Sequence, residues 1–205
     1  MPELDLEPAA REVAGLLDGV TDDHLSAPTP CRDMPVAALL DHLIGLSVAF
    51  TEAARKTASG SSAPQSIAEH LDPGWRTVLP QRLQELVESW RDPSAWEGMT
   101  EAGGVTMPAE VMGVVAVDEL VLHGWDLARA TGQSFSCDPA STAAVLEFTA
   151  ETAKPENDQL REGLFGPAVD VGEDASDLDR ALGYAGRDPK WTPAPVLGRG
   201  RRAYA

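Results

Sequence analysis

The sequence predicts a mainly α-helical protein whose helices pack as an antiparallel bundle. Apolar residues recur at intervals of three and four in several stretches, which is the spacing that places them on one face of a helix. Short or moderate connections join these stretches, so helices that are neighbours along the chain are expected to run antiparallel. The chain has 205 residues and 43% of them are hydrophobic, which is enough for one domain with a sizeable core. We therefore expect a single domain over residues 1–205.

The helical core is predicted to occupy about residues 4–153, and a short helical and irregular extension about residues 154–205. Proline and glycine mark several helix ends: Asp33 and Pro35 are predicted to open the second helix, Pro108 and Gly132 to bound the fourth, and Gly186 to close the last. Asp138, before Pro139, is the expected cap of the fifth helix. The predicted helices span Leu4–Val20, Pro35–Ala58, a start near Ile67 or Pro73 through Trp90, Val111–Gly132, Pro139–Thr152 and Ser176–Ala185.

Four segments between and after these helices are predicted to be non-helical. Ser59–Pro64 is expected to be a flexible connection, and Arg91–Pro108 a loop with a short extended piece in its middle. Gly166–Gly172 is expected to be extended, and the tail Trp191–Ala205 irregular. The Arg-rich run in that tail is interpreted as a frayed terminus, with an anion-binding patch as the alternative.

Charge and cysteine content exclude several classes of function. The formal net charge is −17, whereas nucleic acids and anionic membranes are bound by proteins rich in Lys and Arg. We see no signal peptide and no stretch of the roughly 18–20 apolar residues that a membrane span needs. Two cysteines, Cys31 and Cys137, do not make a disulfide framework in a chain of this length. The sequence thus predicts a cytoplasmic protein, a monomer or a homodimer, that binds neither nucleic acid nor membrane.

A carboxylate and an imidazole interrupt the apolar fourth helix. Glu119 and His123 are four residues apart, so they share one helical face among small apolar side chains. A buried charge needs a partner, and a metal ion accepts both a carboxylate and a neutral imidazole. The alternative is an ordinary acid–histidine pair on an exposed flank of the helix. Asp126, three residues further on, is a candidate to orient an imidazole by hydrogen bonding, or else a surface acid.

The second helix offers His42 as a third ligand. Ala38, Gly45 and Ala49 are in line with it and leave space around its ring. Two imidazoles and one carboxylate match the ligand set of an open zinc site, in which water completes the coordination. The alternatives are that His42 flanks the core and bonds to a carbonyl, and that His70 supplies the third ligand instead.

Two stretches together resemble a known family. They are Thr29–Leu43, with Asp33, Pro35 and His42, and Asp118–Gly132, with Glu119, His123 and Asp126. The pair is similar to the DinB-like metal-binding family, and within it to the actinobacterial branch related to the N-terminal domain of mycothiol-dependent maleylpyruvate isomerase. The run Gly186–Pro189 also fits that branch. The resemblance implies a four-helix bundle that holds a divalent metal through His42, Glu119 and His123, usually zinc, with nickel as the alternative.

The chain departs from this branch in ways that bear on function. Many relatives have Trp where this chain has Met34, and the residues after the fifth helix are too few for the additional C-terminal domain of the isomerase. No catalytic arginine can be aligned, and Arg76 and Arg82 are only candidate anion binders. Cys31 is a candidate nucleophile because it precedes a helix N-terminus, although most such cysteines fill the core.

Three functions remain open from the sequence. The first is a metal-dependent enzyme in which a low-molecular-weight thiol of the mycothiol type attacks an electrophile, giving transfer or isomerisation. The second is a metal-binding sensor or small-ligand binder without turnover. The third is a bundle in which the metal only adds folding stability.

Overall fold

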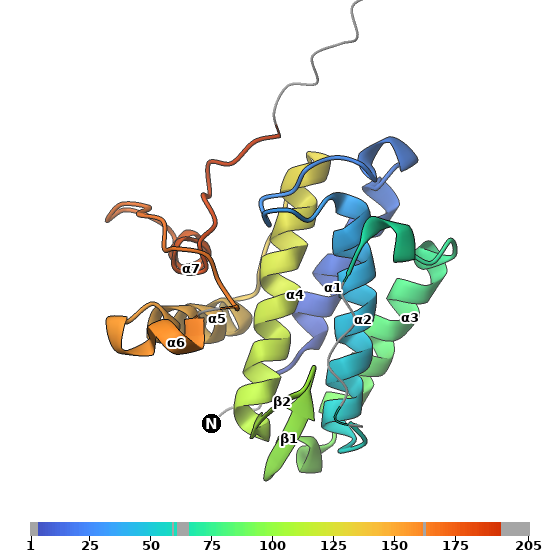
Figure 1. Cartoon of the computed structure of the whole chain (residues 1–205), viewed down its shortest axis with the longest axis vertical. Helices are drawn as coiled ribbons and strands as arrows, with labels where there is room; N and C mark the ends of the chain where they lie inside the picture. Colours follow the sequence, from blue (N-terminus) through green and yellow to red (C-terminus); the bar gives the residue numbers. More distant parts are fainter. Residues whose placement is uncertain (1–3, 59, 61–65, 162, 194–205) are drawn as a thin grey trace, which may run out of the picture.

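The computed structural model describes residues 4–58, 60, 66–161 and 163–193, and most of its elements are helices (Figure 1). The longer helices are α1 (Glu7–Leu16), α2 (Val36–Ala54), α3 (Trp75–Trp90), α4 (Ala109–Thr131), α5 (Pro139–Thr152) and α7 (Asp177–Tyr184). Shorter elements are α6 (Asp158–Arg161), the 3-10 turns η1 (Leu17–Gly19), η2 (Asp22–His24), η3 (Ala68–His70), η4 (Pro93–Trp96) and η5 (Pro155–Asn157), and the strands β1 (Met99–Ala102) and β2 (Val105–Pro108). The prediction of a mainly helical protein is confirmed.

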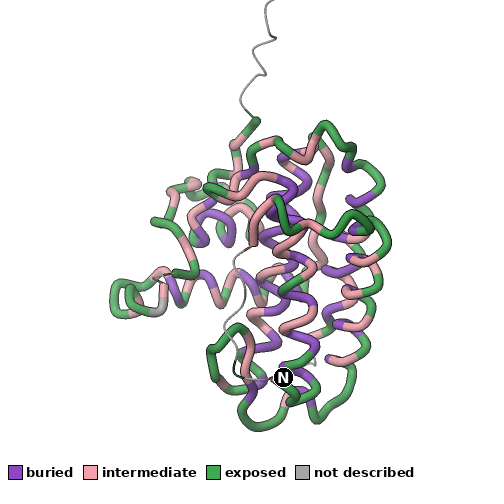
Figure 2. Tube along the Cα trace, turned by 45° about the vertical axis from the view of Figure 1, so that its right-hand side comes forward, coloured by how far each residue is buried: buried purple, intermediate pink, exposed green. Residues whose placement is uncertain are grey.

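Helices α1 to α4 lie side by side and enclose the core (Figure 1). Both α1 and α2 contact α3 and α4. Helix α5 packs against α4, and α7 packs against α5. Buried positions line the inner faces of these helices, and exposed positions follow their outer faces (Figure 2). Because α4 has neighbours on two sides, it is buried around most of its circumference, as expected for a helix with few polar residues.

Close packing along α4 depends on a glycine. A Cβ at Gly113 would lie 2.3 Å from the Trp96 ring and 3.0 Å from that of Trp90. These two indoles are fixed in turn, since Trp90 Nε1 donates to the carbonyl of Phe50 at 3.0 Å and Trp96 Nε1 to that of Trp90 at 2.8 Å. Because residue 113 has no side chain, the rings of Trp90 and Trp96 can pack against the first turns of α4. At its other end, α4 stops at Gly132 in a left-handed conformation (φ 70°), as predicted.

Several helix boundaries differ from the sequence prediction. Asp33 is not a cap, because it has a left-handed backbone (φ 62°), and α2 starts only after Pro35. The same helix ends at Ala54 rather than Ala58, since Lys56 is also left-handed (φ 57°). The third helix begins at Trp75 and continues through Pro80. The predicted cap Asp138 accepts hydrogen bonds from the first turn of α5. Ser176, where the last helix was predicted to begin, accepts one from the first turn of α7.

The predicted loop between α3 and α4 contains a β-hairpin. Strands β1 and β2 pair antiparallel, with Ala102 opposite Val105 next to the turn. Gly103 and Gly104 form that turn with φ of 59° and 84°, a pair of positive values that suits glycine and the right-handed twist of a hairpin. Thr100 ties the hairpin to the bundle by donating to the carbonyl of Ala53 at 2.5 Å.

Further predictions concern the C-terminal part, the Ser59–Pro64 connection and the hydropathy. Residues 166–172 form no strand in the structure, while α7 ends at a left-handed Gly186 (φ 79°) as expected. Most of the Ser59–Pro64 connection and of the Arg-rich tail lies outside the described residues. Contrary to expectation, α2 is long and apolar enough to span a membrane by length and composition, but 61% of that window is buried inside the protein, as in a core helix.

Candidate metal centre

Three side chains from two helices meet at one point on the inner face of α4. Oε2 of Glu119 lies 3.0 Å from Nε2 of His123 and 3.3 Å from Nε2 of His42. The two imidazole rings are nearly perpendicular, at 88°, with centroids 4.8 Å apart. Glu119 and His123 are adjacent because they are one turn apart on α4. His42 lies beside them because α2 packs against α4. The structure thus brings together His42, Glu119 and His123, the three residues singled out from the sequence.

Burial differs across the three side chains. His123 is 8% exposed, whereas His42 and Glu119 are 28% and 25% exposed. The cluster therefore has one buried side, set by His123, and one side that solvent or a small molecule can reach. Ser66 is half-buried, and its Oγ lies 3.4 Å from Nδ1 of His42.

Behind His123 lies a buried chain of polar contacts. Its Nδ1 is 3.0 Å from Oδ2 of Asp126, a carboxylate with no exposed surface. The same oxygen accepts a hydrogen bond of 3.1 Å from Nη2 of Arg187, which follows α7 and is itself buried. Asp126 thus contacts His123 from the interior, and Arg187 is a site residue that sequence reasoning missed. The only signal was its place in the Gly186–Pro189 run.

The electrostatics of the cluster follow from these contacts. Burial favours the neutral form of His123, but hydrogen bonds to Asp126 and Glu119 outweigh it and raise the pKa of His123 to about 9. Burial would likewise raise the pKa of Glu119, yet its hydrogen bonds to His123 and His42 bring it well below the ordinary value. Without a metal, the carboxylate is therefore ionised between two imidazoles.

Cys31 lies next to this chain of contacts. Its Sγ and the nearest ligand atoms of His123 and Asp126 are all within 4.8 Å of one another. Burial, followed by the charge of Asp126, raises the pKa of the Cys31 thiol from 9.0 to about 11. The thiol form therefore predominates at neutral pH, which opposes a role as nucleophile. Asp126 is already paired with a guanidinium, so this trio is a poorer cation site than the one around Glu119.

Asp118 is a second buried acid on α4 that the sequence did not single out. It is 2% exposed, and its Oδ1 accepts no hydrogen bond within the described ranges. Burial and the neighbouring Glu119 charge raise the pKa of Asp118 well above its ordinary value.

The remaining candidates from the sequence lie elsewhere. His70 is exposed on η3 and belongs to neither group of ligand atoms found among the residues that the structure describes. Arg76 donates to Asp22 at 2.9 Å, and Arg82 donates to Glu85 at 2.8 Å. Cys137 is half-buried before α5.

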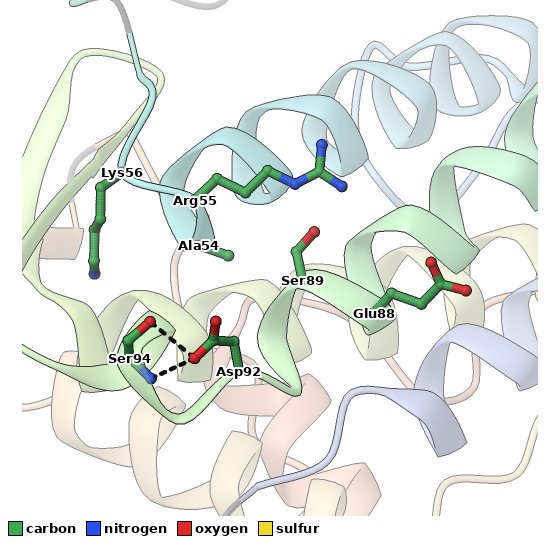
Figure 3. Close-up of a pocket in the computed structure, with 7 residues that line it drawn as sticks. All are labelled: Ala54, Arg55, Lys56, Glu88, Ser89, Asp92 and Ser94. Atoms are coloured by element: carbon green, nitrogen blue, oxygen red, sulfur yellow. Dashed lines mark hydrogen bonds between the residues drawn. The ribbon is translucent and has the colours of Figure 1, made fainter.

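A cavity of about 410 Å³ lies at the C-terminal end of α2 (Figure 3), and its lining residues do not include those of the histidine cluster. Charges of both signs line it, and Asp92 is engaged by the backbone and hydroxyl of Ser94. Lys56 Nζ also has a partner, because it donates to the carbonyl of Ala95 at 2.9 Å. Glu88 accepts a hydrogen bond from Gln84 outside the cavity, and the lining residues include no histidine or cysteine. The cavity is lined by Ala54, Arg55, Lys56, Glu88, Ser89, Asp92 and Ser94.

This chain is a mainly helical protein, and most of it matches one known protein family. The family model of the mycothiol maleylpyruvate isomerase N-terminal domain matches residues 6–128, which include His42, Glu119, His123 and Asp126. The chain therefore belongs to this family. Arg187 lies outside the matched residues.

Relatives and a solved structure agree with this assignment. Two uncharacterized proteins of Mycobacterium tuberculosis, MT0763 and Rv0738, are each 27% identical to the chain over 137 residues, covering 62% of this chain and 65% of theirs. The crystal structure of the mycothiol-dependent maleylpyruvate isomerase superposes with a TM-score of 0.55 at 14% identity, covering 70% of this chain and 66% of the isomerase. At that identity the likeness concerns the fold. The chain spans just under two thirds of the length of these proteins.

Proposed function

We propose that this protein is a metal-dependent enzyme that uses a low-molecular-weight thiol of the mycothiol type for transfer or isomerisation. The observation that carries the proposal is the meeting of His42, Glu119 and His123 in a chain of the maleylpyruvate isomerase N-terminal domain family. We further propose that the metal is zinc, with nickel as the alternative, that helices α1 to α4 form an antiparallel four-helix bundle, that residues 1–205 are one domain, and that the protein is cytoplasmic.

The donor set fits a tetrahedral ion. Two donor atoms at about 2.0–2.1 Å from one tetrahedral ion are roughly 3.3–3.4 Å apart. Nε2 of His42 and Nε2 of His123 lie 3.3 Å and 3.0 Å from the same oxygen of Glu119. Little movement would thus bring these three atoms around one ion. Two neutral imidazoles and a carboxylate are also the ligand chemistry of open zinc sites.

The chain's own residues would prepare and limit such a site. Nδ1 of His123 is 3.0 Å from Oδ2 of Asp126, so when a metal displaces the Nε2 proton, Asp126 would keep the proton on Nδ1 and leave the Nε2 lone pair to the ion. The partial exposure of His42 and Glu119 leaves one side open for a small thiol. A divalent metal held there would favour the thiolate form of a bound thiol at neutral pH. The high pKa of Cys31 keeps the protein's own nearby thiol from competing as a nucleophile.

One observation favours a second candidate, a metal-binding protein without turnover. The superposition covers 66% of the isomerase at 14% identity, so the likeness concerns the fold and not all the groups with which that enzyme acts. In the second candidate the three-residue cluster would hold a metal and a small ligand without completing a reaction.

The test uses protein loaded with Co²⁺ in place of zinc and titrated with mycothiol. A new near-ultraviolet absorption band from thiolate-to-cobalt charge transfer, absent with Glu119→Gln, is the expected result. The absence of this band at saturating mycothiol would contradict thiol binding at the site. Consumption of mycothiol by the zinc-loaded protein across a panel of electrophiles then separates the enzyme from the non-catalytic binder.

A further inference from the structure

Asp126 on α4 is a buried carboxylate, and the cation that compensates its charge comes from a residue outside α4. Its side chain has no exposed surface. Its Oδ2 lies 3.0 Å from Nδ1 of His123 and 3.1 Å from Nη2 of Arg187. A buried carboxylate is unfavourable unless a cation or hydrogen-bond donors compensate for lost water. Arg187 is 9% exposed and supplies that compensation.

The turn after α7 directs Arg187 toward α4. Gly186 is left-handed, and a Cβ there would lie 3.0 Å from backbone atoms of Gly166 and Pro167. The amide of Arg187 donates to the carbonyl of Leu182 at 2.8 Å, and its Nη1 donates to that of Ala185 at 3.0 Å. The backbone and the side chain are thus both fixed, which leaves Nη2 aimed at Asp126.

The segment around Arg187 is part of the packed protein. Ala181, Leu182 and Ala185 belong to the core, each at 1% exposure or less. A second arginine makes a separate link, because Arg129 on α4 donates from Nε to the carbonyl of Trp191 at 3.1 Å. Arg129 therefore holds the same segment but does not contact Asp126 or His123 in the described hydrogen bonds.

We propose that Arg187 is a positioning residue of the metal centre: through Asp126 it fixes the ring and the tautomer of His123 so that Nε2 faces Glu119 and His42. This inference rests on the proposed metal site and extends it beyond residues 6–128, since the C-terminal segment completes the site. Groups that hydrogen-bond to a metal-ligating histidine commonly change metal affinity 10–100-fold when they are removed.

The experiment compares zinc affinity, measured by competition with a chromophoric chelator, in wild type, Arg187→Met and Arg129→Met. Arg187→Met is expected to bind zinc about 10–100-fold more weakly. Arg129→Met, the matched control for loosening of the segment, is expected to remain within about threefold of wild type. The d–d spectrum of the Co²⁺-loaded protein should shift in Arg187→Met only. Equal affinities and spectra in the two variants would overturn the inference.

A second comparison follows the path through Asp126. In an Asp126→Asn background, Arg187→Lys is expected to change zinc affinity less than about threefold, although it weakens binding in the wild-type background. An unchanged effect in the Asn background would overturn the inference, and this comparison does not need the methionine variant to fold. Wild-type protein that binds no zinc would contradict the proposed function itself. A zinc affinity that does not change when Arg187 is replaced would contradict the inference but not the proposed function.

Discussion

Glu119 and His123 stand one turn apart on α4, with Oε2 of the carboxylate 3.0 Å from Nε2 of the imidazole. Because both residues are on one helix, this distance is set by local geometry. His42 joins them only when α2 packs against α4. Two of the three candidate ligands are thus brought together by one helix, and the third requires the folded protein.

Zinc binding should stabilise the folded state, because only that state brings His42 to Glu119 and His123. At free zinc 100 times its dissociation constant, the expected gain is about 2.7 kcal/mol, which for a chain of this size raises Tm by roughly 5–10 °C. Thermal unfolding followed by circular dichroism, with and without zinc, measures the change. Mg²⁺, which prefers oxygen ligands, is the matched control. A zinc-induced shift that persists in His123→Ala would contradict this prediction.

Gly113 is expected to tolerate no side chain. In Gly113→Ala the new methyl group would meet the Trp96 ring, which is held by its own hydrogen bond, so we expect a loss of about 1–3 kcal/mol in the free energy of unfolding. Gly45→Ala on α2 is the control, because a Cβ there has open space and alanine favours a helix by about 0.5–1 kcal/mol. Urea unfolding measures both changes. Equal stabilities for the two variants would argue against the close packing of Trp96 on α4.

Cys31 should react slowly with alkylating reagents in the folded, metal-free protein. Its pKa of about 11, compared with 9.0 for an ordinary thiol, leaves about 100-fold less thiolate at any pH well below 9. Iodoacetamide labelling of Cys137→Ser protein between pH 7 and 9.5, followed by mass spectrometry, measures the rate. The logarithm of the rate should rise by about one unit per pH unit without levelling off. A plateau below pH 9, or a rate equal to that of urea-unfolded protein, would show that the thiol is not perturbed.

The sequence predicts those parts of the centre that depend on local geometry. The spacing of Glu119 and His123 defines their shared face, and the helix that carries His42 follows from its apolar period. The hairpin was also open to prediction, since Gly103 and Gly104 are the usual turn residues between two short strands. Only one short extended piece was expected in this loop, and the pairing of two strands was missed because each strand is only four residues long.

Other features depend on packing that periodicity does not reveal. Arg187 is 61 positions from Asp126, and its contact needs the turn after α7 to fold back onto α4. Asp118 is buried because α4 is covered by α1 and α2 as well as by α5. The few polar residues of α4 indicate a buried helix, but they do not indicate which helix covers Asp118. The left-handed Asp33 replaced an expected cap, since the loop before α2 is fixed by the hydrogen bonds of Thr29 to Cys31 and Met34.

Metal content is the most direct test of the three-residue centre. Protein incubated with zinc and then dialysed exhaustively should retain about one ion per chain, measured by inductively coupled plasma mass spectrometry. His42→Ala should lose this ion, because one of three protein ligands is gone, while His70→Ala, which removes an exposed histidine outside the cluster, should retain it. Retention of the ion by His42→Ala, or its loss in both variants, would contradict the account.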